Sequence, residues 1–550
     1  MTAVTAGRRS ARAAARPRGS ALAGTGTLIR FILRRDRIRI PVWIGAITAY
    51  VLLTAAALPD LYLTAAQRQS RAALMGNPAA RALAGPGHGL EDYTFGAMMT
   101  QEMLGFTAVL VALMSLLLIV RHTRAEEAEG RAELVRASVV GRHATATAAL
   151  VVVGAANLVL GALVAAGLGS LGIESIPWSG SLLFGASLAA VGLVFTGVAA
   201  VTAQVTEHSR GASGLAGVVL GSTYSLRAAG DMGDGTLSWL SPIGWAQATR
   251  AYVDDRWWPL GLTLALTAVL IAVAFAVSAR RDLGAGLVPP RPGPPAASAV
   301  LGSPFGLAFR LQRASLLGWS IAMFLFALGY GTLVGEVERF ITDNPQMLEF
   351  FAQAEGPSLI HAFLATIVSF WAMVASVYAI LAALRLRSEE NAGRAEPVLS
   401  TAVSRARWAA SHLAIALVGS VILLLVSGLG LGLTSASSTG DASLLPQMVG
   451  AALAYAPVLW LIIGAAAALF GLVPRAAALS WTVVVYALTV GMLGGLLGFP
   501  DWTYQLSPFD HVPMLPGEGL RLPPLVVLTA IAAVLITVGL AGFRRRDVGA

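Results

Sequence analysis

Two charged segments carry the side chains best suited to chemistry in this otherwise apolar chain. The first charged segment, RAEEAEGRAELVRASVVGR, spans residues 124–142, and the second charged segment, RSEENAGRAEPVLSTAVSR, spans residues 387–405. The two are identical at ten of nineteen positions. Their acidic and glycine residues are Glu126, Glu127, Glu129, Gly130 and Glu133 in the first, and Glu389, Glu390, Gly393 and Glu396 in the second.

Neither segment has the neighbours that catalysis requires. The chain has seven scattered histidines and no cysteine, which excludes thiolate chemistry, zinc–thiolate sites and disulfides. It also has no lysine, so all 38 basic residues are arginines. A P-loop needs its lysine to reach the phosphates of ATP. We therefore predict no catalytic residue and no metal site in this chain.

The spacing of the glutamates favours a surface helix that binds a partner. On one continuous helix, Glu126 and Glu133 lie two turns apart on the same face, and Glu127 forms an i,i+4 pair with Arg131. We predict a short helix that presents carboxylates to a soluble protein. A solvated charged loop is the alternative, and the presence of two similar copies at equivalent places disfavours it.

The elements that position these segments are membrane-spanning helices. The hydrophobic fraction is 56%, and only 12% of residues are charged, with a mean hydropathy of +0.72. Runs such as AVLVALMSLLLIV are long and continuous, unlike the alternating strands of a β-barrel. We predict an all-α integral membrane protein with twelve spans, at 41–58, 96–120, 144–169, 181–206, 212–227, 260–278, 316–334, 363–384, 408–434, 447–473, 478–498 and 522–543.

The distribution of arginine predicts the orientation of these spans. With the N-terminus inside, most of the 38 arginines fall in the inner connections, and the acidic residues favour the outer ones. Both termini are then cytoplasmic, in a multi-pass protein of the bacterial cell membrane. The net charge of +9 reflects this topology and contact with membrane lipid, so we expect no nucleic-acid partner.

An internal duplication sets the domain organisation. The two charged segments both follow the second span of a six-span set, and RRDLGA at 280–285 returns as RRDVGA at 545–550. We predict two tandem six-helix units in parallel, related by a pseudo-two-fold axis along the membrane normal. The domains are a disordered basic tail (1–25), a first unit (26–282), a proline-rich linker (283–303) and a second unit (304–550). Residues 26–40 and 304–319 are expected to form amphipathic helices in the inner interface.

These features together resemble a known family. A glutamate-rich segment with a central glycine, placed after the second of six spans, is similar to the coupling helix of ABC-2 type exporter permeases. The fused twelve-span form resembles the polyketide antibiotic (tetronasin-type) exporter permeases of actinobacteria. The resemblance covers residues 26–550.

The resemblance implies a partner that supplies the energy. In that family the coupling helix docks on a separate ATP-binding cassette ATPase, which binds ATP and magnesium, so this chain itself needs no cofactor. Two coupling helices imply two ATPase subunits per chain, contacted by the glutamates of the two charged segments. Because Pro397 stands where Leu134 stands in the first copy, we expect the second helix to end or kink early.

Few residues are candidates for the transport path. Glu102 is an acidic residue near the start of the second span, where it meets either a cationic substrate or the outer water layer. Six apolar residues either line an adaptable substrate pocket or belong to the core, and these are Met98, Met99, Met103, Phe106, Phe370 and Trp371. A path with so few charges suits a bulky lipophilic or amphiphilic compound.

Three outer segments are long enough to fold on their own. Residues 59–95 and 335–362 are each typical of a helix, a break and a second helix, which indicates a gate or plain interfacial helices. The tryptophan-rich stretch before residue 259 suits a short re-entrant helix pair or an aromatic belt. A proton-driven multidrug transporter of the major facilitator type remains the alternative function. It is disfavoured because such transporters have a short basic loop where this chain has acidic segments.

Overall fold

The computed structural model describes residues 20–282, 284–289, 293, 295–342, 359–497 and 499–547. Every regular element in these residues is a helix, and no strand occurs among them. The chain divides into two compact units, Met1–Pro292 and Gly293–Ala550. The expectations for the tail up to residue 19 and for the stretch 343–358 lie outside the described residues.

Ten helical stretches within the described residues are long and apolar enough to cross a membrane. They are Arg39–Leu61, Phe95–Ala128, Ala144–Ser170, Trp178–Val205, Pro259–Ser278, Pro304–Thr332, Phe363–Asn391, Arg405–Thr439, Leu444–Leu472 and Leu522–Arg545. Each coincides with one of the predicted spans. The prediction of an all-α, multi-pass membrane protein is therefore confirmed.

The other two predicted spans also form helices, but they are not among these ten stretches of the described residues. Helix α11 (Ser209–Met232) contains a buried Arg227 and Asp231 one turn apart. Helix α22 (Ser480–Leu497) is 18 residues long. The exact twelve-span arrangement therefore stays a prediction.

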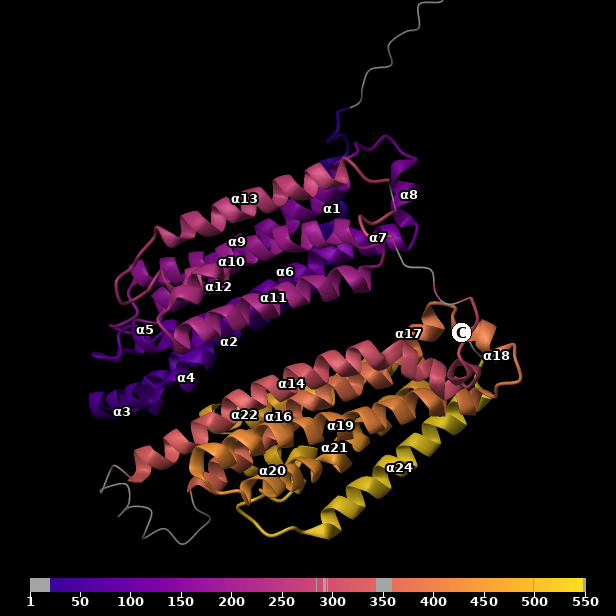
Figure 1. Cartoon of the computed structure of the whole chain (residues 1–550). Coiled ribbons are helices and arrows are strands. Elements are labelled where there is room, and N and C mark those ends of the chain that lie inside the picture. Colours follow the sequence, from indigo (N-terminus) through magenta and orange to yellow (C-terminus); the bar gives the residue numbers. More distant parts are fainter. Residues whose placement is uncertain are drawn as a thin grey trace, which may run out of the picture. The chain divides into compact units, whose positions relative to one another are not determined.

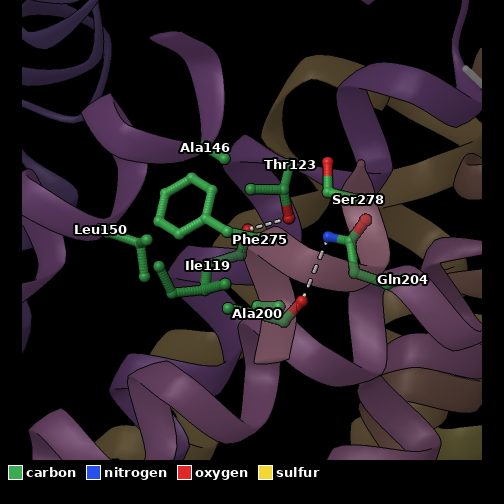
Figure 2. A pocket seen from close by; sticks show the side chains of 9 residues that line it. Ile119, Thr123, Ala146, Leu150, Ala200, Gln204, Phe275 and Ser278 are labelled. Carbon is green, nitrogen blue, oxygen red and sulfur yellow. Dashed lines mark hydrogen bonds between the residues drawn. The ribbon is translucent and has the colours of Figure 1, made fainter. Parts of the chain in front are cut away.

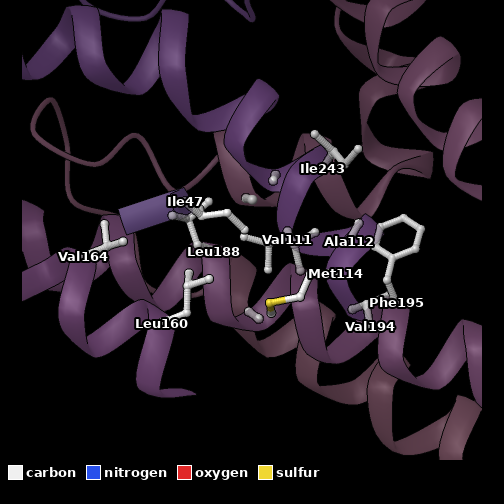
Figure 3. Close-up of a cluster of buried hydrophobic side chains, with 14 of the residues drawn as sticks. Ile47, Val111, Ala112, Met114, Leu160, Val164, Leu188, Val194, Phe195 and Ile243 are labelled. Atoms are coloured by element: carbon white, nitrogen blue, oxygen red, sulfur yellow. The ribbon is translucent and has the colours of Figure 1, made fainter. Parts of the chain in front are cut away.

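The first unit is a bundle built from six long helices, which run side by side in Figure 1. These are α2 (Arg39–Leu61), α6 (Leu104–His122), α9 (Ala144–Ser170), α10 (Trp178–Val205), α11 and α13 (Pro259–Ser278). Their core is aliphatic and aromatic, and Figure 3 shows Val111 and Met114 of α6 among Leu160, Leu188 and Phe195.

Glycines let two helices of this bundle approach closely. A Cβ on Gly161 of α9 would lie 2.5 Å from the carbonyl oxygen of Gly185 on α10, and a Cβ on Gly185 would lie 2.2 Å from that of Gly161. In a membrane no hydrophobic force drives helices together, so their association depends on close packing. Small residues at such crossings let the backbones approach closely. The abundant glycine of the sequence has this role at the α9–α10 contact.

The two ends of the first unit differ in character. One end, called here the arginine-rich end, holds α1 (Thr25–Arg35), the first charged segment, and residues 278–282 and 284–289. The opposite end holds α3 (Ala65–Met75), α4 (Pro78–Leu83), α5 (Phe95–Met98) and α12 (Pro242–Gln247), as Figure 1 shows. Helix α3 begins with a capping box from Thr64 and Gln67, and α4 begins at Pro78 with Asn77 as its cap. The helix–break–helix prediction for residues 59–95 is confirmed.

The tryptophan-rich stretch is short and partly helical. A 3-10 turn, η2 (Thr236–Leu240), is followed by α12, which Ser241 caps with its side chain. Trp239 and Trp258 stack with ring centroids 5.4 Å apart, and both are about half exposed. Two exposed indoles in contact suit the polar–apolar boundary of a membrane.

The second unit is built from α14 (Pro304–Thr342), α16 (Leu359–Ala383), α19 (Arg405–Thr439), α20 (Leu444–Leu453), α21 (Ala456–Leu472), α22 and α24 (Leu522–Arg545). Helices α20 and α21 share one span and meet just before Pro457. Helices α21 and α24 cross at glycines, because a Cβ on Gly471 would lie 2.0 Å from the carbonyl oxygen of Gly539. The arginine-rich end of this unit holds the second charged segment and residues 544–547 (Figure 1).

The predicted amphipathic helices differ between the units. In the first, α1 ends at Arg35, and a turn separates it from α2. In the second, residues 304–319 are the beginning of α14, which continues without a break into the span. The helix expected at 304–319 is therefore present, and it is continuous with the span. Asp36 is a buried carboxylate in the turn between α1 and α2, and the aligned residue of the second unit is Gln312, which is buried within α14.

Candidate functional site

Each charged segment folds as two short helices and not as one. The first contains α7 (Arg124–Ala128) and α8 (Arg131–Arg136). The second contains α18 (Ala395–Leu399) and all but the first two residues of α17 (Arg385–Asn391). Gly130, with φ +71°, and Gly393, with φ +67°, lie between them. Glycine adopts this left-handed conformation without the penalty that a Cβ brings. The prediction of one continuous helix is therefore wrong, because the shared glycine turns the chain.

The turn changes which charges meet. Arg131 donates from Nε to Glu126 at 3.0 Å, and the i,i+4 pair predicted between Glu127 and Arg131 is not among the ion pairs of the described residues. In the second unit Arg394 donates from Nε to Glu389 at 2.7 Å. Each turn is thus closed by the first glutamate and the arginine after the glycine.

The first glutamate of each segment also binds a second arginine inside its own unit. Glu126 accepts from Arg35 at the end of α1, at 2.5 Å, and Glu389 pairs with Arg385 of α17 at 2.6 Å. The Glu126 side chain is 15% exposed and that of Glu389 is 5% exposed. These two carboxylates therefore point into their units and not towards a soluble partner.

The second glutamate binds the arginine that follows the last helix of its unit. Arg281 donates from one terminal nitrogen to both oxygens of Glu127, at 2.9 Å each. Arg546 donates from its two terminal nitrogens to the two oxygens of Glu390, at 2.7 and 2.6 Å. Arg281 and Arg546 belong to the repeated RRD motifs, so the duplicated sequence landmarks meet in space within each unit.

The remaining acidic residues face outward. Glu129 is 54% exposed, although it also pairs with Arg131, and Glu133 and Glu396 are exposed. Leu134 of α8 is 76% exposed. Each segment therefore divides into an inward-facing part that holds the unit together and an outward-facing part, centred on α8 or α18, that is open to a partner.

Pro397 does not shorten the second copy. Helix α18 ends at Leu399, the position equivalent to Arg136, where α8 ends. Pro397 lies in the first turn of α18, where proline is tolerated because its missing N–H has no helical acceptor. The expectation that the second copy ends or kinks early is therefore wrong.

A buried ion cluster joins the turn after α1 to the end of α6. Asp36 lies 2.6 Å from His122 Nε2, 3.4 Å from Arg121 Nε and 3.7 Å from an Arg39 terminal nitrogen. Asp36 and His122 are each only 2% exposed. Because α7 begins two residues after His122, this cluster fixes the position at which the first charged segment leaves the bundle.

A small cavity lies beside the same end of the bundle. Its volume is about 20 Å³, and its lining comes from α6, α9, α10 and α13 with the neighbouring Thr123. Figure 2 shows Thr123 and Gln204 bonded to the carbonyl oxygens of Ile119 and Ala200. Such a cavity holds about one water molecule. It is therefore too small for a bulky substrate.

The apolar path candidates lie mainly in the two cores. Met98, Met99 and Met103 are buried in the first unit. Phe106 is 49% exposed and contacts Tyr50 edge to face, with ring centroids 5.8 Å apart. In the second unit, Trp371 is buried and contacts Phe370 with ring centroids 5.5 Å apart. None of these residues lines the small cavity, and their role in a path stays a prediction.

Glu102 is paired at the opposite end of the first unit. It lies in a π-helical turn, Met99–Met103, and accepts from Arg71 of α3 at 2.7 Å and from the Tyr93 hydroxyl at 2.9 Å. Burial and the Glu102 charge raise the pKa of Tyr93 well above its usual range. Burial alone would lower the pKa of Arg71, but Glu102 outweighs it and raises that pKa. A cationic substrate at Glu102 would therefore have to compete with Arg71.

Comparisons with known proteins place this arrangement in a family. A family model described as the C-terminal domain of the multidrug efflux system permease Rv1217c matches residues 26–277 and 301–544. The multidrug efflux system permease protein Rv1217c of Mycobacterium tuberculosis (strain ATCC 25618 / H37Rv) is 42% identical over 538 residues, which is 96% of each chain.

The chain belongs to this family of multidrug efflux permeases. Membership confirms the prediction of an efflux permease in a multi-pass membrane protein. The narrower likeness to tetronasin-type exporters is not part of what the match shows. Among the described residues no group of three or more histidine, aspartate or glutamate side chains could hold a metal ion.

Sequence reasoning missed the partners of the glutamates. The sequence marks Arg281 and Arg546 only as landmarks of the repeat, and it places Asp36 within an amphipathic helix. A usable signal is present, because an acidic pair and an arginine pair each recur at the same place in both halves. Residues that recur together are candidates for mutual contact within each copy.

Proposed function

We propose that the chain is the permease subunit of an ABC-2 type exporter and moves bulky lipophilic or amphiphilic compounds out of a bacterial cell. Separate ATP-binding cassette subunits supply the energy. One observation carries this proposal: the same helix–glycine–helix element follows a span in each unit and presents its second helix outward. A family whose relative is named a multidrug efflux permease supports the class of substrate.

The outward-facing surface has the chemistry of a protein docking site. In the first unit, Leu134 lies exposed on α8 with Glu129 and Glu133 close by in the sequence. In the second unit, Glu396 and Pro397 of α18 are exposed. An apolar contact with an acidic surround fits a partner groove that has an apolar floor and basic walls. Each ATPase subunit would receive one such element, giving two ATPase subunits per chain.

The energy source follows from composition. The chain has no lysine, and a standard P-loop uses a lysine to bind the phosphates of ATP. ATP and magnesium therefore bind to the partner in this proposal. The arginine-rich ends of both units face the cytoplasm, in keeping with the positive-inside rule, which also places both termini there.

The substrate path is proposed to include the residues predicted for it. Glu102, with Arg71 as its competing partner, would meet cationic groups of a substrate. Met98, Met99, Met103 and Phe106 in the first unit, with Phe370 and Trp371 in the second, would supply flexible apolar contacts when the helices move. A kinetic test is Glu102→Gln, which should raise KM for a cationic substrate and leave KM for a neutral one unchanged.

The docking proposal is tested by charge reversal on the outward-facing helices. The permease is co-expressed with the candidate ATPase, identified as a neighbouring reading frame with a Walker A lysine and no membrane span. The double variant Glu133→Arg with Glu396→Arg should insert normally and lose co-purification of the ATPase. The matched control is Glu174→Arg, which makes the same change at an exposed residue of the opposite end of the first unit. Full retention of the ATPase by the double variant would contradict the proposal.

The energy source is tested in proteoliposomes. Transport should require the ATPase and ATP, and it should persist when the proton gradient is abolished. Transport by the permease alone, driven by a proton gradient without ATP, would instead establish a secondary transporter.

A further inference from the structure

We propose that Arg281 and Arg546 are transmission residues, each of which makes the charged segment and the last helix of its unit move as one body. The inference rests on the proposed function, since it assigns how a displacement of the charged segment reaches the membrane helices. It gives the inward-facing glutamates, Glu127 and Glu390, a role separate from docking.

In the first unit Arg281 joins three elements. Besides its two bonds to Glu127 of α7, it donates from Nε to Gln204 Oε1 at 2.6 Å, near the end of α10. It also donates to the carbonyl oxygen of Ala285 at 2.8 Å. Its side chain is only 7% exposed. The arginine that follows α13 is therefore held by the charged segment and by α10 together.

Two further arginines tie the first charged segment to the same stretch of chain. Arg124, which is fully buried, donates to the carbonyl oxygens of Gly284 and Ala285 at 2.9 and 3.1 Å. Arg142 donates to the carbonyl oxygens of Ser278 and Ala279 at 3.1 and 2.7 Å. The segment is thus bound at one end to Gly284 and Ala285, which follow α13, and at the other to Ser278 and Ala279 at the end of α13.

In the second unit Arg546 makes the equivalent connection with different chemistry. It binds Glu390 through two parallel hydrogen bonds, and its guanidinium lies 4.8 Å from the ring centroid of Phe470 on α21. Arg405 at the start of α19 donates to the Arg546 carbonyl oxygen at 2.6 Å. Gln204 near the end of α10 accepts a hydrogen bond from Arg281, and Phe470 near the end of α21 offers its ring to Arg546. The two residues thus hold the equivalent arginine in each unit.

The geometry of these pairs suits the transfer of motion. The two parallel hydrogen bonds between Arg546 and Glu390 restrict orientation as well as distance. The orientation of Arg281 is restricted by its bonds to Glu127 and Gln204 together. The Glu127 and Glu390 side chains are 14% and 6% exposed, so solvent screens these pairs less than it screens surface charges. A force applied to α8 or α18 through docking would pass through these pairs to α13 with α10, and to α24 with α21.

The first experiment uses the permease alone in lipid nanodiscs and needs no ATPase. The variants Arg281→Gln and Arg546→Gln should each raise amide hydrogen exchange by about tenfold or more in the charged segment and the last-helix end of the altered unit. The matched controls are Arg280→Gln and Arg545→Gln, which remove the neighbouring exposed arginines and lower the net charge equally. Glu127→Gln should also raise exchange in the charged segment and at the last-helix end of the first unit, because it weakens the pairs of this carboxylate with Arg281 and Arg124.

Two results in this experiment would overturn the inference. One is unchanged exchange in the charged segment of Arg281→Gln. The other is a uniform rise across the whole unit, including the core of α9, which would assign the arginine to folding. Neither result depends on whether an ATPase binds, so a failure of the proposed function remains distinguishable.

The second experiment uses the complex with the ATPase. The variant Arg281→Gln with Arg546→Gln should keep the ATPase bound and hydrolysing ATP, while the substrate moved per ATP falls by about fivefold or more. The control Arg280→Gln with Arg545→Gln should stay close to the wild type. Equal transport per ATP in both double variants would refute the transmission role. A wild-type complex that fails to assemble would instead refute the proposed function.

Discussion

The Glu102 carboxylate accepts a hydrogen bond of 2.7 Å from the Arg71 guanidinium and so ties α3 to the start of a membrane span. The connection joins an amphipathic surface helix to a π-helical turn within a helix of the bundle. Single π-helical turns are rare and occur often at functional sites. The pair therefore fixes α3 over the opposite end of the first unit.

Removing this carboxylate should loosen α3. In Glu102→Gln the Arg71 guanidinium and the Tyr93 hydroxyl lose a charged acceptor, and a partly buried pair of this kind contributes about 1 kcal/mol. Amide exchange in residues 65–75 should rise by a few-fold, while the α9 core stays unchanged. The control is Glu91→Gln, which changes an exposed carboxylate in the loop between α4 and α5. Equal exchange in the two variants would count against the role of the pair.

His88 should make the opposite end of the first unit sensitive to acid. Burial and the positive charges of Arg250, Arg256 and Arg81 lower the pKa of His88 from 6.5 to about 4. The negative charge of Asp254 acts in the other direction but is outweighed. The unfolded chain therefore binds a proton more readily, so stability is lost as pH falls from 6.5 towards 4. In His88→Asn the drop in melting temperature between about pH 7 and about pH 4.5 should be smaller than in the wild type. The exposed His511 offers the control His511→Asn, and an identical drop in all three proteins would contradict the assignment.

The left-handed turn at Gly130 should tolerate asparagine better than valine. A Cβ there meets nothing within 4 Å, so the cost is conformational and not a clash. A β-branched residue in this conformation costs about 1–2 kcal/mol, while asparagine costs less. Gly130→Val should therefore weaken ATPase binding by about tenfold and Gly130→Asn should largely preserve it.

The control for this prediction is Gly440→Val, because Gly440 has φ +79° and also has open space around it. It ends α19 and belongs to neither charged segment. Equal loss of ATPase binding in Gly130→Val and Gly440→Val would show that general strain, and not the shape of the charged segment, is responsible.

Asp36 should matter more for stability than other acidic residues of the first unit. Its buried carboxylate meets His122, Arg121 and Arg39. Replacing it with alanine leaves these donors without their acceptor, at a cost of about 3 kcal/mol. Asp36→Ala should lower the melting temperature of the permease by several degrees, whereas Asp282→Ala, at an exposed residue of the same end, should not. Equal melting temperatures of the two variants would contradict a stabilising role for the buried cluster.

The sequence predicted the helical spans well because long apolar runs have few alternatives in a membrane. The ten stretches of the described residues that satisfy length and composition each coincide with a predicted span. The break predicted within residues 59–95 has a local cause. Helix α4 begins at Pro78 with Asn77 as its cap, and both residue types favour the start of a helix.

The charged segments were harder to predict because their structure depends on distant residues. Helical spacing placed Glu126 and Glu133 on one face, but Gly130 turns the chain between them. The orientation of Glu127 is set by Arg281, which lies 154 positions away in the sequence. The early end expected at Pro397 also failed, because a first-turn proline is compatible with a helix. Long-range ion pairs leave no periodic signal, so only the recurrence of both partners in each half pointed to them.

The most direct test of the account is cross-linking from single cysteines, since the native chain has none. Leu134 and Leu63 are both 76% exposed, but Leu134 lies on α8 and Leu63 lies at the opposite end of the same unit, between α2 and α3. In membranes that contain the ATPase, Leu134→Cys should cross-link to the ATPase, and Leu63→Cys should not. An assembled, active complex in which Leu134→Cys gives no such product, or in which both variants give it equally, would contradict the account.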